Sequence, residues 1–382
     1  MKHHLFRDLR RLYSAECKSV LKYLQSSRLV KIVLFLLITC AILHYSHFTI
    51  FDLHRIFTKN SSLSNQARFY HFENRDISFE NKEITDDSGA EAIYNDYFIT
   101  ENQINSSSNH KEPCPIVSPY LRGALKPIQN VSNNISDVED ELGMIGSLPA
   151  FGGFWQPRSC RARTRVALIV PYRNRLTHLT IFLRNMHPFL QSQQIGYGIF
   201  VVEQTADSQP FNKAMIMNAA FVEVNKTGQF SCYIFHDIDL LPEDDRNVYK
   251  CAEQPRHLSV AIDKFEYSLP YESLIGGVSA FTKSQFEKIN GFSNLYWGWG
   301  GEDDDTANRI SAANMTISRY FPEFARYTMI NHKHQKTNPK RYKLLYTSKE
   351  RYRSEGLNSL TYRRIVHQQN QLFTWLLFEL PR

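Results

Sequence analysis

Hydrophobic residues between positions 165 and 240 follow two alternating patterns. Continuous apolar runs at 165–171, 197–203 and 232–240 predict three buried strands. Between these runs, an apolar face over 177–191 predicts one helix, and a second helix is predicted over 212–224. Parallel strands that alternate with helices are joined by right-handed crossovers. The pattern therefore predicts an α/β fold with a mainly parallel central sheet flanked by helices.

A longer apolar segment occupies residues 32–51 and follows a basic tail at 1–31. About twenty residues of helix cross the hydrocarbon core of a membrane. A cleavable signal peptide is the alternative, but the basic segment before it is long and no clean small-residue cleavage motif follows. Basic residues mark the tail as cytoplasmic. We therefore predict a signal-anchor and type II topology, with the rest of the chain in the lumen or outside the cell.

The remainder of the chain divides into a polar segment and a large folded domain. Residues 52–111 are rich in Asn, Ser, Asp and Glu without sustained periodicity, which predicts a lumenal stem before a domain at 112–382. Hydrophobic residues make up 42% of the chain, as is typical of a folded globular protein. The mean hydropathy of −0.39 excludes a polytopic membrane protein.

The net charge of +7 lies almost entirely in the tail. Residues 1–31 carry +6 of it, so the other residues together carry +1. A nearly neutral body offers no basic surface for a phosphate backbone, and this argues against nucleic-acid binding.

Cysteines and sequons fit a lumenal location. Four cysteines follow the stem, Cys114, Cys160, Cys232 and Cys251, and four cysteines allow three pairings. Six N-x-S/T sequons indicate a glycosylated protein of the secretory pathway, at Asn60, Asn105, Asn130, Asn134, Asn225 and Asn314.

Two candidate binding motifs follow predicted strands, where ligands of such sheets collect. Asp237 and Asp239 stand at the end of the third strand, and their oxygens suit Mg or Mn if the chain bends there. Solvated turn acids are the alternative. The segment 171–175, Pro-Tyr-Arg-Asn-Arg, follows the first strand and has the cations to hold a diphosphate. An ordinary basic loop is the alternative there.

The most specific motif is 297–305, Trp-Gly-Trp-Gly-Gly-Glu-Asp-Asp-Asp. Tryptophans in a glycine-rich backbone provide flat apolar faces that stack on sugar rings. An acidic helix start is the alternative for the four acids, but it leaves the tryptophans unexplained. The motif predicts a carbohydrate or nucleotide site. A lone histidine such as His332 is by itself more often a surface residue than a ligand.

Eight motifs together resemble the beta-1,4-galactosyltransferase family over about 114–362. They are Pro171-Tyr-Arg-Asn-Arg175, Phe211-Asn-Lys213, Asp237-Ile-Asp239, Gln254-Pro-Arg-His257, Asp263-Lys-Phe265, Gly276-Gly-Val-Ser-Ala280, Trp297 to Asp305, and Gly356-Leu-Asn-Ser-Leu-Thr-Tyr362. The resemblance implies a GT-A type domain, a Golgi type II membrane enzyme, and inverting, Mn²⁺-dependent transfer from a UDP-sugar. It also implies the disulfides Cys114–Cys160 and Cys232–Cys251.

Carried over position by position, the resemblance implies a role for each motif residue. The implied metal ligands are Asp239, Met329 and His332, although a thioether is a soft partner for a hard cation. The implied catalytic residues are Asp303, as general base, and Glu302. The implied donor-binding residues are Pro171, Arg173, Arg175, Phe211, Lys213, Asp237, Leu274, Trp299 and Gly300. The implied acceptor-binding residues are Tyr271, Gly301, Asp304, Arg341, Tyr342 and Leu345.

Two positions depart from the family pattern. Lys213 stands where members often have Arg, which keeps the charge and loses the bidentate fork. Leu274 stands where galactose-specific members carry Tyr, and the smaller side chain leaves room for an N-acetyl group. This resembles the invertebrate branch that transfers N-acetylgalactosamine.

The expected reaction moves GalNAc from UDP-GalNAc to the 4-hydroxyl of a terminal beta-linked GlcNAc. Galactose transfer from UDP-Gal is the close alternative. A non-catalytic sugar-binding protein and a metal-dependent hydrolase are the rivals from other classes. The sequence does not choose between glycolipid and N-glycan acceptors or between oligomeric states.

Overall fold

The computed structural model describes residues 111–206, 209–332 and 336–381. The predicted tail at 1–31, the anchor at 32–51 and the stem up to residue 110 lie outside the described residues, as do the sequons at Asn60 and Asn105. No helix within the described ranges is long and apolar enough to cross a membrane.

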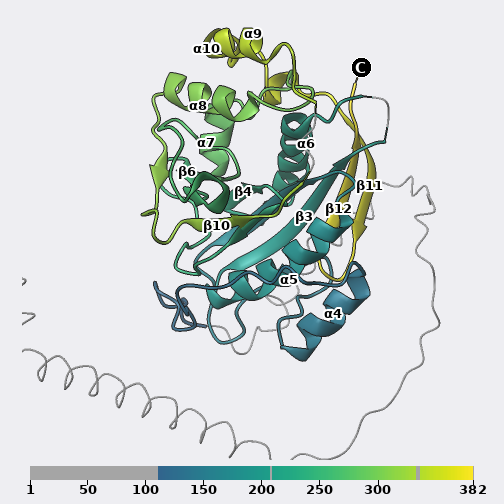
Figure 1. The fold of residues 1–382 in the computed structure, drawn as a ribbon, viewed down its shortest axis with the longest axis vertical. Helices are drawn as coiled ribbons and strands as arrows, with labels where there is room; N and C mark the ends of the chain where they lie inside the picture. Colours follow the sequence, from purple (N-terminus) through teal and green to yellow (C-terminus); the bar gives the residue numbers. More distant parts are fainter. Residues whose placement is uncertain (1–110, 207–208, 333–335, 382) are drawn as a thin grey trace, which may run out of the picture. The chain divides into compact units, whose positions relative to one another are not determined.

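The predicted alternation of strands and helices is confirmed in the centre of the domain (Figure 1). Strands β2 (Arg165–Tyr172), β3 (Gly196–Gln204) and β4 (Cys232–His236) alternate with helices α5 (Leu176–Ser192) and α6 (Lys213–Lys226). β2 pairs in parallel with both β3 and β4. The C-terminal strand β12 (Thr374–Glu379) adds to the other side of β3, also in parallel.

Both faces of this parallel centre are covered, which explains the continuous apolar runs. Ala167 and Ile169 of β2 belong to a core cluster that includes the buried face of α6. Val166, Leu168 and Val170 belong to a second cluster that includes the buried face of α5. Successive residues of a strand point to opposite faces, so a strand buried on both sides has no polar positions.

The prediction of a mainly parallel sheet is wrong outside this centre. The sheet order is β11-β12-β3-β2-β4-β8-β6-β9, and β1 also pairs with β3. The antiparallel pairs are β11–β12, β4–β8, β6–β8 and β1–β3, involving β11 (Arg363–Gln369), β8 (Val278–Phe281), β6 (Arg256–His257) and β1 (Phe154–Trp155). β6 and β9 (Ser318–Arg319) are parallel. Antiparallel neighbours need no helical crossover, so their segments lack the strand–helix alternation.

The predicted strand at 232–240 is interrupted. Strand β4 ends at His236, and β5 (Leu240–Pro242) belongs to a separate three-stranded sheet with β10 (Arg326–Met329) and β7 (Ala261–Ile262). Between them the chain bends, with the N–H of Asp237 bonded to the carbonyl of Gly277. The bend that two metal-binding carboxylates would require is therefore present at Asp237–Asp239.

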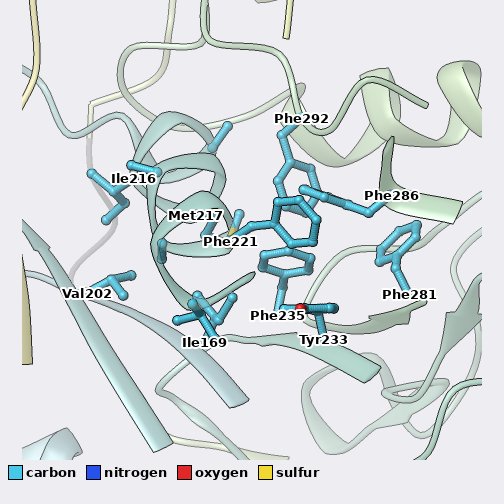
Figure 2. Packing of buried hydrophobic residues seen from close by; sticks show 14 of the residues in the cluster. Ile169, Val202, Ile216, Met217, Phe221, Tyr233, Phe235, Phe281, Phe286 and Phe292 are labelled. Atoms are coloured by element: carbon cyan, nitrogen blue, oxygen red, sulfur yellow. The ribbon is translucent and has the colours of Figure 1, made fainter. Parts of the chain in front are cut away.

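Aromatic packing supports the face of the sheet that carries α6 (Figure 2). Met217 and Phe221 of α6 pack near Phe235 of β4. The Phe235 ring lies 4.7 Å from the rings of both Phe286 and Phe292, centroid to centroid. These contacts fix β4 against the segment that leads to residue 302.

The other helices in the described ranges are short, and the two at 341–351 pack against the helix at 302–312 rather than on the sheet (Figure 1). They are α4 (Ile135–Met144), α7 (Lys283–Lys288), α8 (Glu302–Ala312), α9 (Arg341–Tyr346) and α10 (Ser348–Arg351), with 3-10 turns at Asp263–Phe265 and Leu357–Ser359. Both implied disulfides, Cys114–Cys160 and Cys232–Cys251, are present.

Candidate active site

Three chain segments converge on Asp239 at the carboxyl ends of β2 and β4. Oδ2 of Asp239 lies 2.7 Å from Nε2 of His332 and 3.5 Å from Nη1 of Arg175. Arg175 also donates from Nη2 to Nδ1 of His332 at 3.1 Å. A guanidinium only donates, so the His332 ring accepts at Nδ1 and donates from Nε2 to Asp239.

The charge of Asp239 is stabilised at this junction. Burial alone would raise the pKa of its carboxyl, but the hydrogen bond from His332 and the charge of Arg175 outweigh burial and lower it. An ionised carboxylate beside an imidazole is a donor set that suits a divalent transition metal such as Mn²⁺.

Met329 lies next to Asp239 in the chain packing because its strand, β10, pairs with β5, which begins directly after Asp239. Its backbone lies opposite Leu240, and the N–H of Ile330 donates to the carbonyl of Asp239 at 2.7 Å. The N–H of Met329 is held by Oδ1 of Asp263 at 2.9 Å. Its side chain packs against the core cluster on the α5 face. In the part of the chain that the structure describes, no group of three His, Cys, Asp or Glu side chains is placed to hold a metal.

Lys213 links the Asp237–Asp239 bend to Glu302, the first residue of α8. It is the first residue of α6, which Asn212 caps by accepting from the N–H of Met215. Its Nζ lies 2.8 Å from Oδ1 of Asp237 and 3.5 Å from Oε1 of Glu302. Burial opposes the charge on Lys213, but these carboxylates outweigh burial and raise its pKa. Burial raises the pKa of Asp237, which the lysine only partly offsets.

Asp303 lies in the first turn of α8, which begins after Gly301. Burial, followed by repulsion from Glu302 and Asp304, raises its pKa to about 7. A carboxylate with that pKa can take a proton near neutral pH, as a general base must. It packs directly against Gly276, where an added Cβ would meet Oδ2 of Asp303 at 2.3 Å.

The acids on either side of Asp303 also face the site. Oε2 of Glu302 is buried and has no hydrogen-bond partner among the described residues. A buried carboxylate oxygen of this kind is suited to accept a bond from a ligand hydroxyl. On the other side, the hydroxyl of Tyr271 donates to Oδ1 of Asp304 at 2.9 Å.

Asp305 does not belong to the site. Its side chain is fully buried in an ion-pair network, 2.6 Å from Nε of Arg309 and 2.8 Å from Nη2 of Arg351. Both arginines also contact Glu355. The fourth acid of the motif therefore anchors α8 to α10.

The tryptophan loop is held between two segments of the predicted site. The N–H of Gly298 donates to the carbonyl of Phe211 at 2.9 Å, and the backbone of Trp299 pairs with that of Thr337. Trp299 is 51% exposed, and the Arg341 guanidinium lies 5.5 Å from the centroid of its ring. Backbone φ angles of +87°, +101° and +98° at 298, 300 and 301 explain the glycines there.

The other predicted residues lie around this centre. Arg173 donates to the carbonyl of Gln209 and lies over the Phe211 ring, and Pro171 is the last but one residue of β2. Tyr342 is 70% exposed and its hydroxyl accepts from Arg341. Leu274 and Leu345 are half-buried, and their backbone carbonyls accept from Arg319 and Ser348. Leu274 belongs to the loop that carries Tyr271 and Gly276.

The motif residues alone did not identify every group that shapes this site. Gly276 belongs to the motif at 276–280, but nothing in the sequence indicates its close approach to Asp303. Arg319 lies outside all the motifs and binds the backbone of the segment at 272–274.

Comparison with known proteins identifies the family. Residues 114–252 match the N-terminal region of glycosyl transferase group 7, and residues 256–333 match a family described as the N-terminal domain of galactosyltransferase. Human beta-1,4-galactosyltransferase 4 is 42% identical over 275 residues, which cover 71% of this chain and 78% of the human protein. The chain belongs to the beta-1,4-galactosyltransferase family. It is therefore a glycosyltransferase of the hexosyltransferase class.

Further relatives agree with this assignment. Human beta-1,4-galactosyltransferase 6 is 46% identical over 257 residues, covering 66% of this chain and 65% of that protein. A solved structure of a Drosophila beta-1,4-galactosyltransferase 7 mutant, in complex with manganese, UDP-Gal and xylobiose, is 26% identical with a TM-score of 0.50. The match covers 57% of this chain and 95% of that chain. The implied beta-1,4-galactosyltransferase resemblance is confirmed, and the fold is GT-A-like with a mixed sheet.

Proposed function

We propose that this enzyme transfers GalNAc from UDP-GalNAc to the 4-hydroxyl of a terminal beta-linked GlcNAc, with inversion at the anomeric carbon. The observation that carries the proposal is the packing of Asp303 against Gly276. It brings a general base with a pKa of about 7 onto the loop that also contains Leu274. This supports placing the proposed base and the proposed donor-selecting residue in one site.

Asp239, His332 and Met329 would hold Mn²⁺, the metal present in the solved Drosophila relative. When bound, Mn²⁺ would act as a Lewis acid that neutralises the charge of the departing diphosphate. Carboxylate and imidazole converge at 2.7 Å, which fits this role. Arg173, Arg175 and Lys213 would bind and orient the diphosphate.

Asp303 would remove the proton from the acceptor 4-hydroxyl as that oxygen attacks the anomeric carbon. The bond from this carbon to the diphosphate oxygen breaks, and UDP leaves with the electron pair. Attack opposite the leaving group inverts the configuration. Glu302 and Asp304 would hold sugar hydroxyls, and the unpartnered Oε2 of Glu302 supports this role.

Trp299 would close over the donor and exclude water, since an exposed indole offers a flat apolar face for a sugar ring. Arg341, Tyr342 and Leu345 would line the pocket for the acetamido group of the acceptor. We further propose that the enzyme is a Golgi membrane protein with residues 112–382 in the lumen. Of the four sequon asparagines in the described residues, Asn130, Asn134 and Asn314 are exposed, as glycosylation requires. Asn225 is half-buried, and its Oδ1 accepts from the Tyr233 hydroxyl at 3.0 Å.

Galactose transfer from UDP-Gal is the second candidate, because the relatives named above are galactosyltransferases. Leu274 favours GalNAc on steric grounds. A tyrosine there would fill the space of the acetamido group and add a hydroxyl, and such a steric block discriminates more strongly than a one-methylene difference.

The test is to assay the full-length enzyme with UDP-GalNAc and UDP-Gal in parallel, with and without a beta-GlcNAc acceptor. We expect faster GalNAc transfer, and transferred rather than hydrolysed sugar when acceptor is present. Leu274→Tyr should depress GalNAc transfer and keep or raise galactose transfer, while Leu274→Met should behave as wild type. A wild type that strongly prefers UDP-Gal, or a donor ratio unchanged by Leu274→Tyr, would refute the donor assignment.

A further inference from the structure

Three side chains outside the active site bind the backbone of the 271–277 loop: Arg319, His257 and Ser259, whose Oγ donates to the carbonyl of Gly276 at 3.1 Å. Nη2 of Arg319 donates to the carbonyls of Glu272 at 2.6 Å and Leu274 at 2.7 Å. Nε of the same guanidinium donates to Nδ1 of His257 at 3.3 Å. Nε2 of His257 lies 3.0 Å from the carbonyl of Gly276. Three alternate carbonyls of the loop are therefore bound by one connected pair.

The protonation of this pair follows from its geometry. Arg319 can only donate, so Nδ1 of His257 accepts and Nε2 carries the proton that bonds Gly276. Full burial, with the nearby Arg319 charge, lowers the pKa of His257 to about 3, so the ring is neutral. The pair is held in register, because His257 on β6 lies opposite Arg319 on β9.

The loop that Arg319 and His257 bind carries residues of the proposed acceptor site, the proposed donor site and the surroundings of the proposed base. Tyr271 bonds Asp304, Leu274 is the proposed donor-selecting side chain, and Gly276 packs against Asp303. A shift of the Leu274 carbonyl would move this side chain relative to the base. Displacements on the order of 1 Å in such a site can cost about a hundredfold in rate.

We propose that Arg319, acting with His257, is a positioning residue that sets donor-sugar selectivity by fixing the 271–277 loop against Asp303. The role of the loop in donor choice rests on the proposed function, but its fixation by Arg319 does not. The planar guanidinium of Arg319 matters, because its Nη2 donates to two carbonyls while its Nε donates to His257. A lysine provides a charge without this geometry.

The experiment compares Arg319→Lys and Arg319→Gln with the matched control Arg256→Lys in the full-length enzyme. Arg256 lies one residue before His257 on β6, and its described contacts are with Tyr320 rather than the loop. We expect both Arg319 variants to change the GalNAc-to-galactose ratio of kcat/KM at least about threefold and to raise the donor KM. Affinity for UDP, which lacks the sugar, should stay within about twofold, and Arg256→Lys should leave the ratio unchanged.

Hydrogen–deuterium exchange provides a readout that needs no substrate. Amides at 272–278 should exchange at least about tenfold faster in Arg319→Lys than in wild type or Arg256→Lys. Unchanged exchange there would overturn the proposal, whichever sugar the enzyme transfers. Faster exchange with an unchanged donor ratio would limit Arg319 to a structural role and also overturn it. A wild type that transfers neither sugar would instead refute the proposed function, with the exchange result still standing.

Discussion

Gly276 and Asp303 are packed so closely that a Cβ atom on residue 276 would lie 2.3 Å from Oδ2 of the aspartate. The two residues come from different elements, the 271–277 loop and the first turn of α8. A glycine at 276 is therefore required by the position of the carboxylate. The backbone φ of Gly276 is not in the left-handed region, so the requirement is one of space.

Gly276→Ala should displace the Asp303 carboxylate and reduce kcat by about a hundredfold, with a small effect on stability. Steady-state kinetics and a thermal unfolding curve would measure the two effects. Gly143→Ala is the matched control, because a Cβ there meets nothing within 4 Å. Near-normal turnover in Gly276→Ala would show that the position of Asp303 is not critical.

The pKa of about 7 at Asp303 predicts the pH dependence of the reaction. A general base must be deprotonated, so kcat/KM should fall about tenfold per pH unit below pH 7 and level off above it. Lys213 lowers this pKa, so Lys213→Met should move the acidic limb to higher pH. Asp303→Asn should keep UDP-sugar binding and lose about a hundred- to ten-thousandfold in turnover. An acidic limb that stays in place in Asp303→Asn would assign it to another group.

Variants that lack a proposed metal ligand should lose both activity and the stabilisation that Mn²⁺ provides. Asp239→Asn and His332→Ala should abolish transfer, and a chelator should silence the wild type. At a Mn²⁺ concentration about a hundredfold above Kd, the wild type should gain about 2.7 kcal/mol, or roughly 5–10 °C in Tm. Neither variant should show this shift. Full activity with a chelator present and no added metal would argue against the site.

Neighbouring acids of the Glu302–Asp305 run should respond in opposite ways. Asp305→Asn breaks a buried ion-pair network and should cost about 3–5 kcal/mol of unfolding free energy. Asp304→Asn should change stability by no more than about 0.5 kcal/mol and reduce transfer instead. Chemical denaturation of both variants measures the difference. Equal losses of stability would contradict the placement of Asp305.

The parallel centre of the fold was predictable because a strand buried on both faces has a continuous apolar sequence. The runs at 165–171 and 197–203 correspond to β2 and β3 for this reason. The antiparallel additions were not predictable in the same way. β6 and β9 contain two residues each, too few for any periodicity, and they pair because the chain returns to them from distant positions.

The sequence by itself determined the family, through motifs whose residue types and order are specific, and through them the cysteine pairs. Only the tertiary structure decided what each acid in the 302–305 run does, because four consecutive carboxylates are equivalent in sequence and differ in burial and partners. It also decided the contacts of Arg319, since backbone carbonyls accept hydrogen bonds whatever side chain they carry. The raised pKa of Asp303 is of the same kind, because burial and neighbouring charges exist only once α8 and the 271–277 loop have packed together.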